Sequence, residues 1–60
     1  MYNEYDLKEA IRAIESTIKK CEKVLPKLKE GTSSHTLLIR RIRAFEIAVD
    51  LIKRELESRV

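Results

Sequence analysis

The sequence predicts an all-α fold, an antiparallel two-helix hairpin, and three observations support this prediction. The 60 residues include only one Gly and one Pro, too few for the many turns of a small β-sandwich or barrel. Hydrophobic residues make up 43% of the chain, more than a disordered segment carries. Apolar residues also recur at alternating spacings of three and four in both halves, the period of helices that pack side by side.

The first predicted helix covers about residues 3–30 of a single domain, 1–60. Asn3 is suited to cap its N-terminus, and Gly31 is suited to end it. Its apolar series, which we call the seam of this helix, is Leu7, Ile11, Ile14, Ile18, Cys21, Leu25 and Leu28.

Pro26 interrupts the hydrogen-bond ladder of this helix, because proline has no amide hydrogen. The helix either ends near Leu25 or continues with a bend. Leu28 keeps the apolar period and Pro26 falls on the outward side, so we expect a kink near Pro26 and a helix that continues to residue 30.

The second predicted helix covers about residues 35–58, after a turn of about residues 31–34 in which Thr32, Ser33 and Ser34 are each suited to cap it. A connection this short requires the two helices to run antiparallel. The seam of the second helix is Leu38, Ile42, Phe45, Val49, Ile52 and Leu56.

A second set of small and apolar residues lies beside the seam on one side of the hairpin. The other side carries charged residues such as Glu15 and Lys53. Two helices cannot cover both sides of their seam, so we expect a homodimer that forms a four-helix bundle of coiled-coil type. A larger homo-oligomer and a different protein partner are the alternatives, and the pattern leaves open whether a dimer is parallel or antiparallel. The expected interface residues are Ala10, Thr17, Val24, Leu37, Ala44, Ala48 and Leu51.

Residues that carry out catalysis or bind metals are few. Cys21 belongs to the seam and is expected to be a small buried hydrophobic residue, and the one histidine, His35, lies near the predicted turn. The sequence has no glycine-rich phosphate loop, no cysteine pair and no His-Glu metal motif. We therefore expect no enzymatic activity, no cofactor and no metal, and a role in protein–protein interaction or regulation.

The charge distribution suggests an alternative function. Residues 19–43 contain eight basic and two acidic residues, a net charge of +6, whereas the rest of the chain carries −3 and the whole +3. Helix dipoles explain basic residues late in the first helix but not early in the second. Attraction between two antiparallel copies, or binding of RNA or DNA, also fits. The residues expected to contact a nucleic acid or another anion are Lys19, Lys20, Lys23, Lys27, Arg40 and Arg43.

No membrane segment is expected. The longest run without Asp, Glu, Lys or Arg, residues 31–39, is much shorter than the roughly 20 apolar residues that span a bilayer. The first residues are acidic and lack the basic and apolar order of a signal peptide. A cytoplasmic location is the resulting expectation.

Overall fold

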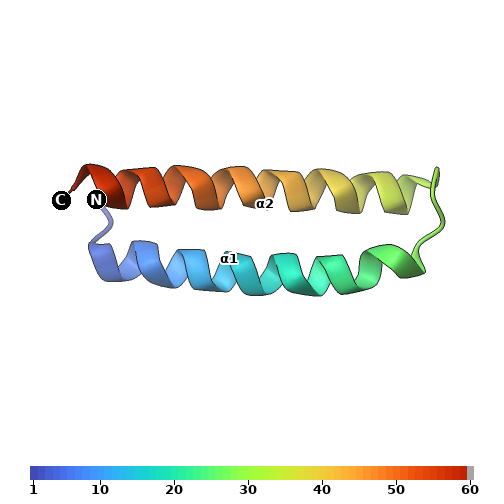
Figure 1. Ribbon diagram of the computed structural model, residues 1–60, viewed down its shortest axis with the longest axis horizontal. Coiled ribbons are helices and arrows are strands. Elements are labelled where there is room, and N and C mark those ends of the chain that lie inside the picture. Colours follow the sequence, from blue (N-terminus) through green and yellow to red (C-terminus); the bar gives the residue numbers. More distant parts are fainter. Residues whose placement is uncertain (60) are drawn as a thin grey trace.

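Two antiparallel helices form the part of the chain that the structure describes, residues 1–59 (Figure 1). In this computed structural model α1 spans Glu4–Val24 and α2 spans Ser33–Ser58. A short 3-10 helix, η1, spans Leu25–Lys27 and leads into the turn. The first and last described residues lie together at one end, the open end, and the turn forms the other end. The predicted all-α hairpin is thus confirmed.

The N-terminus of each helix is capped by a side chain. The Asn3 side-chain oxygen accepts a hydrogen bond from the Asp6 amide at 2.8 Å, as expected for the start of α1. The Thr32 hydroxyl oxygen accepts from the His35 amide at 3.2 Å, which selects Thr32 from the three candidate caps. The same hydroxyl donates to the Lys29 carbonyl at 2.7 Å and so ties the cap to the turn.

The expected kinked helix through residue 30 is not what the structure contains, because α1 ends at Val24. The last amide of its ladder is that of Leu25, which bonds to the Cys21 carbonyl. Pro26 has no amide to bond to the Glu22 carbonyl, and the chain tightens into η1 before Leu28 turns extended at φ −94° and ψ 142°. Pro26 therefore ends the α-helix instead of bending it.

Gly31 lies in the turn rather than directly after the α-helix. Its φ of +84° belongs to the left-handed region, where a Cβ atom is unfavourable. Gly31 belongs to the turn after which α2 returns along α1 (Figure 1).

The predicted seam is confirmed as the buried line of the hairpin. Each of its positions on α1, η1 and α2 is buried or partly buried. Among residues 1–59, Leu7, at 8% exposure, and Val49, at 7%, are the only ones that are buried, and the other seam residues are partly buried. The molecule is a rod with extents of 44 × 16 × 15 Å, and its core is one row of contacts along that rod.

We predict that Gly31→Ala lowers the free energy of unfolding by about 1 kcal/mol, because alanine disfavours a positive φ. No atom lies within 4 Å of the position that the new Cβ would take, so the cost comes from the backbone alone. Gly31→Asn is the matched control and is expected to cost less, since asparagine tolerates this conformation better. Urea unfolding at one fixed protein concentration measures both, and equal stability of Gly31→Ala and wild type would contradict the prediction.

Candidate interaction surfaces

The two sides of the seam differ in their chemistry. Glu15 of α1 and Lys53 of α2 lie on one side, and their charged atoms approach to 3.6 Å across the helix interface. This contact shows that the Glu15 face of α1 and the Lys53 face of α2 lie on the same side of the hairpin. The helical period then places the expected interface residues of both helices together on the opposite side.

We call this second set the outer apolar strip, and most of it is exposed. Val24 is 44% exposed, Leu37 48% and Leu51 57%, whereas Ala10 and Ala48 are partly buried at the margin of the seam. Thr17 and Ala44 are exposed. The strip contains Ala10, Thr17 and Val24 from α1 and Leu37, Ala44, Ala48 and Leu51 from α2.

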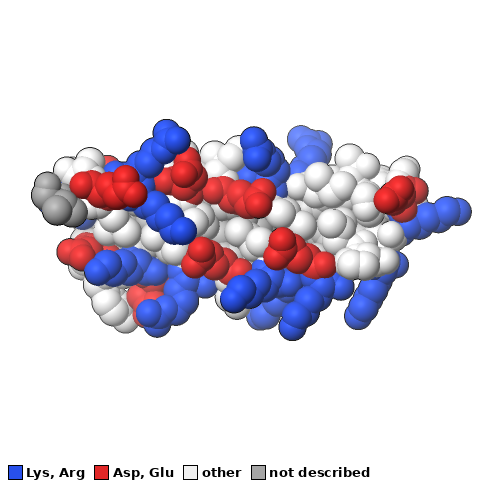
Figure 2. All heavy atoms as spheres, viewed as in Figure 1, with Lys and Arg blue, Asp and Glu red and all other residues white. Residues whose placement is uncertain are grey.

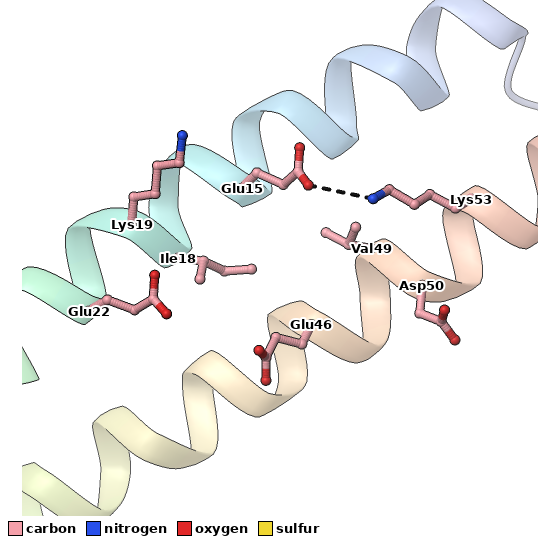
Figure 3. Close-up of a pocket in the computed structure, with 8 residues that line it drawn as sticks. All are labelled: Glu15, Ile18, Lys19, Glu22, Glu46, Val49, Asp50 and Lys53. Atoms are coloured by element: carbon pink, nitrogen blue, oxygen red, sulfur yellow. Dashed lines mark ion pairs between the residues drawn. The ribbon is translucent and has the colours of Figure 1, made fainter.

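The opposite side contains a shallow charged groove of about 460 Å³ (Figure 3). Val49 and Ile18 form its floor, and carboxylates from both helices surround them. In the face shown in Figure 2, acidic side chains gather along the boundary between the helices, and many basic side chains project from the outer margins. The groove is lined by Glu15, Ile18, Lys19, Glu22, Glu46, Val49, Asp50 and Lys53.

The two residues considered for chemistry, Cys21 and His35, lie on different helices. Cys21 is a free thiol, partly buried on α1, and His35 is partly buried in the first turn of α2. Within residues 1–59 neither side chain makes a hydrogen bond, so they do not form the bonded nucleophile–base pair of covalent catalysis. The same residues contain no group of three or more His, Cys, Asp or Glu that could hold a metal ion. None of the described helices has the length and apolar character required to cross a bilayer.

The turn half, defined here as residues 19–43, exposes all of its basic side chains. The six residues predicted to contact an anion are among them. Lys19, Lys20, Lys23 and Lys27 come from α1 and η1, and Arg40 and Arg43 come from the outward positions of α2.

The ion pairs of the hairpin all involve cations outside the turn half, a difference that counting charges along the sequence did not reveal. Every basic residue outside the turn half lies within 4.0 Å of a carboxylate, whereas none inside it does so among residues 1–59. The five pairs are Lys8–Glu4, Arg12–Glu9, Lys53–Glu15, Arg54–Asp50 and Arg59–Glu55.

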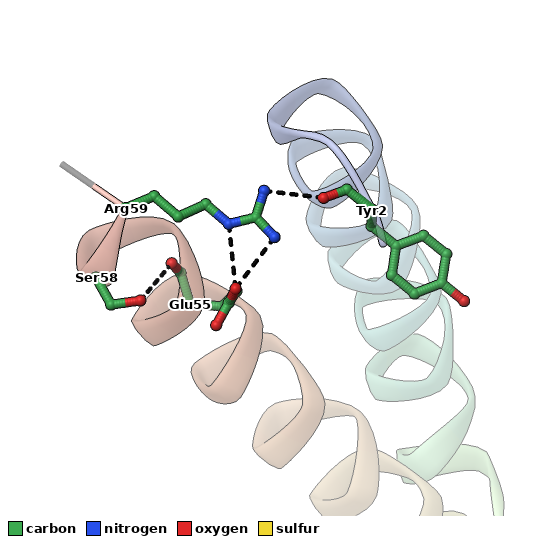
Figure 4. A network of polar contacts seen from close by, with 4 residues as sticks. All are labelled: Tyr2, Glu55, Ser58 and Arg59. Atoms are coloured by element: carbon green, nitrogen blue, oxygen red, sulfur yellow. Dashed lines mark hydrogen bonds and ion pairs between the residues drawn. The ribbon is translucent and has the colours of Figure 1, made fainter.

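Arg59 connects the two ends of the described chain, and the sequence reasoning missed it (Figure 4). Its guanidinium donates to the Tyr2 carbonyl at 2.9 Å and to the Glu55 carboxylate at 3.1 Å. The spacing of Glu55 and Arg59, one turn apart, was the available signal for the second contact. No sequence rule points to the Tyr2 carbonyl, because the contact depends on how the helices align.

Comparison of the chain with protein-family models finds no matching family, and comparisons with curated proteins and with solved structures find no match either. The outer apolar strip, the charged groove and the basic turn half are therefore interpreted from their own chemistry.

The open end offers a pH-dependent test of its geometry. A hydrogen bond from Lys8, the charge of Lys8 and the charge of Arg59 together lower the pKa of Glu4 from its ordinary value of 4.5. A lowered pKa in the folded state means that ionised Glu4 favours folding above its unfolded pKa, and that this contribution is lost as pH falls through the folded pKa.

We predict that Lys8→Gln raises the pKa of Glu4 toward 4.5, because it removes the larger charge effect and replaces a charged hydrogen-bond donor with a weaker neutral one. Arg59→Gln is the matched control and should raise it less, since Arg59 acts only through its charge. A ¹³C NMR titration of the Glu4 carboxyl measures both variants. An unchanged Glu4 titration in Lys8→Gln would show that the 2.7 Å contact is not held in solution.

Proposed function

We propose that the chain is a small non-enzymatic protein that acts through helix–helix contacts and pairs with a second copy of itself in a four-helix bundle. The observation that supports this most directly is how much surface the single hairpin leaves exposed. Its accessible area is 5064 Å² for a mass of 7.0 kDa. A folded monomer of this mass is expected to expose only about 4,000 Å².

The difference, on the order of 1,000 Å² for each chain, is the size of a protein interface. Stable complexes bury about 800 Å² on each partner. The excess belongs to an elongated hairpin, whose Cα radius of gyration is 13.9 Å. A compact chain of this length is expected near 10 Å. A second hairpin alongside the first would remove the excess and give a more compact assembly.

The outer apolar strip is the surface best suited to this contact. It runs from Ala10 near the open end to Leu37 near the turn, so a partner rod could lie along most of its length. Ala10, Ala44 and Ala48 are small enough to let helix backbones approach closely, and Leu51 supplies a large apolar side chain. Covering the strip would also shield the adjacent margin of the partly buried seam from water.

The number of copies follows from the strip being on one side only. The other side presents the charged groove with Glu15, Glu22, Glu46 and Asp50, which are costly to bury without partners. A hairpin with one apolar side closes when two copies cover each other's strip about a two-fold axis. This supports a dimer over a larger homo-oligomer.

We predict that Leu51→Glu weakens self-association at least about tenfold, because it places a charge in the proposed apolar interface. Ile39→Glu is the matched control: Ile39 is also an exposed apolar residue of α2, at 46%, but the helical period places it on the side of Glu46 and Lys53, opposite Ala48 of the strip. This control should leave the dimer dissociation constant within about threefold, since surface changes away from contacts have small effects. Sedimentation equilibrium over a range of concentrations measures both variants and the wild type.

Two results would contradict the proposal. A wild-type protein that stays a folded monomer at micromolar concentration would overturn self-association altogether. A Leu51→Glu variant as dimeric as wild type would leave the dimer but exclude the outer apolar strip as its interface. Circular dichroism of each variant distinguishes loss of association from loss of helix.

A further inference from the structure

We propose that the turn half of the hairpin binds the phosphate backbone of double-stranded nucleic acid. This would be a second function beside self-association and does not depend on it. The observation behind it is the separation of paired and unpaired cations along the rod.

The positive charges of the turn half are not compensated by ion pairs within the described chain. The five cations outside it all have carboxylate partners at 2.7–3.6 Å. Its own eight cations have none within 4.0 Å among the described residues, and the segment holds only two acids, Glu22 and Glu30. Unpaired cations at this density create the positive field that attracts a polyanion.

Four of these cations form a ridge on the outward side of the first helix. Lys19, Lys20, Lys23 and Lys27 are exposed and extend over about 12 Å at the helical rise. The same length of duplex axis carries about seven phosphate charges on its two strands. Glu22 lies among these lysines in sequence, but Figure 3 shows it directed toward the groove, whereas Lys19 points away from α2. The ridge is therefore not interrupted by its nearest acid.

A second copy of the chain is a poor partner for this charge. Residues outside the turn half have a net charge of −3, against +6 within it. Most carboxylates of that region, including Glu4, Glu9 and Glu15, are already paired with their own neighbours. Two copies together carry +6, so the positive excess persists in a dimer.

The type of nucleic acid follows from the aromatic residues. Tyr2 and Tyr5 lie at the open end, and Phe45 is partly buried in the seam. The turn half contains no Phe, Tyr or Trp on which unpaired bases could stack, and its one imidazole, His35, is partly buried. Contacts to a duplex backbone need no stacking, so this surface favours a duplex over a single strand.

The test is fluorescence anisotropy with a labelled DNA duplex and an RNA duplex of the same sequence, titrated between about 50 and 200 mM salt. Contact with four or five phosphates predicts a slope of about −4 for the logarithm of the DNA-binding constant against the logarithm of salt concentration. Binding of only one of the two duplexes supports the proposal and identifies the ligand.

Two variants with the same loss of charge locate the site. Replacing Lys19, Lys20, Lys23 and Lys27 together by Gln should weaken binding at least about tenfold and reduce the slope to about −1. Replacing Lys8, Arg12, Lys53 and Arg54 by Gln is the control and should change affinity less than about threefold. If circular dichroism shows that either quadruple variant is unfolded, the pair K23Q/K27Q and K8Q/R12Q makes the same comparison with two charges each.

Three outcomes would overturn the proposal. The first is that neither duplex binds at the lowest salt concentration with protein in the micromolar range. The second is an equal loss of affinity in the two matched variants, which would indicate net charge rather than a site. The third is competition by polyglutamate as strong as that by duplex at equal charge, which would indicate an acidic protein as the partner. None of these outcomes bears on the dimer, which sedimentation equilibrium measures separately.

Discussion

A single line of apolar contact between α1 and α2 holds the hairpin together, and the other features depend on it. Two helices share only one interface, so each seam side chain contacts the other helix but stays partly exposed to solvent at the edge of that interface. Among the described residues, no side chain is fully buried, because each keeps at least 2% of its surface exposed. Leu7 and Val49, the most buried of them, lie toward the open half of the rod. The large exposed area and the proposed dimer are both consequences of a core only one contact wide.

The turn determines which charges meet. Pro26 ends α1 at Val24, and the 3-10 helix η1 follows before the chain reverses. Leu25 of η1 remains partly buried, and η1 contacts α2. Thr32 caps α2 and bonds back to Lys29, which fixes the point at which the chain reverses. This geometry brings the lysines that end α1 to the same end of the rod as the arginines that begin α2.

The seam and the Asn3 cap were predictable because each follows from local spacing, and the seam period also anticipated the Glu15–Lys53 contact. The end of α1 was not, because the apolar period continues through Leu28 while the backbone ladder stops at Pro26. The spacing of apolar side chains and the backbone hydrogen bonds are separate constraints, and here the missing amide of Pro26 determined where the α-helix ends. Arg59 and the division of ion pairs depend on which carboxylate each cation can reach. Charge counts along a sequence contain no such distances.

The two proposed surfaces also constrain each other. The lysine ridge adjoins the outer apolar strip, because Lys20 and Lys27 lie one turn to either side of Val24. A dimer through the strip would bring these two lysines to its margin and would leave Lys19 and Lys23, which face away from Val24, accessible. A parallel dimer would bring two turn halves of +6 together, and their repulsion would oppose association at low salt. An antiparallel dimer would place them at opposite ends of a rod 44 Å long, well beyond the roughly 10 Å over which charges interact in about 0.1 M salt. Electrostatics therefore favours the antiparallel arrangement, in which each end of the bundle presents one basic ridge to a polyanion.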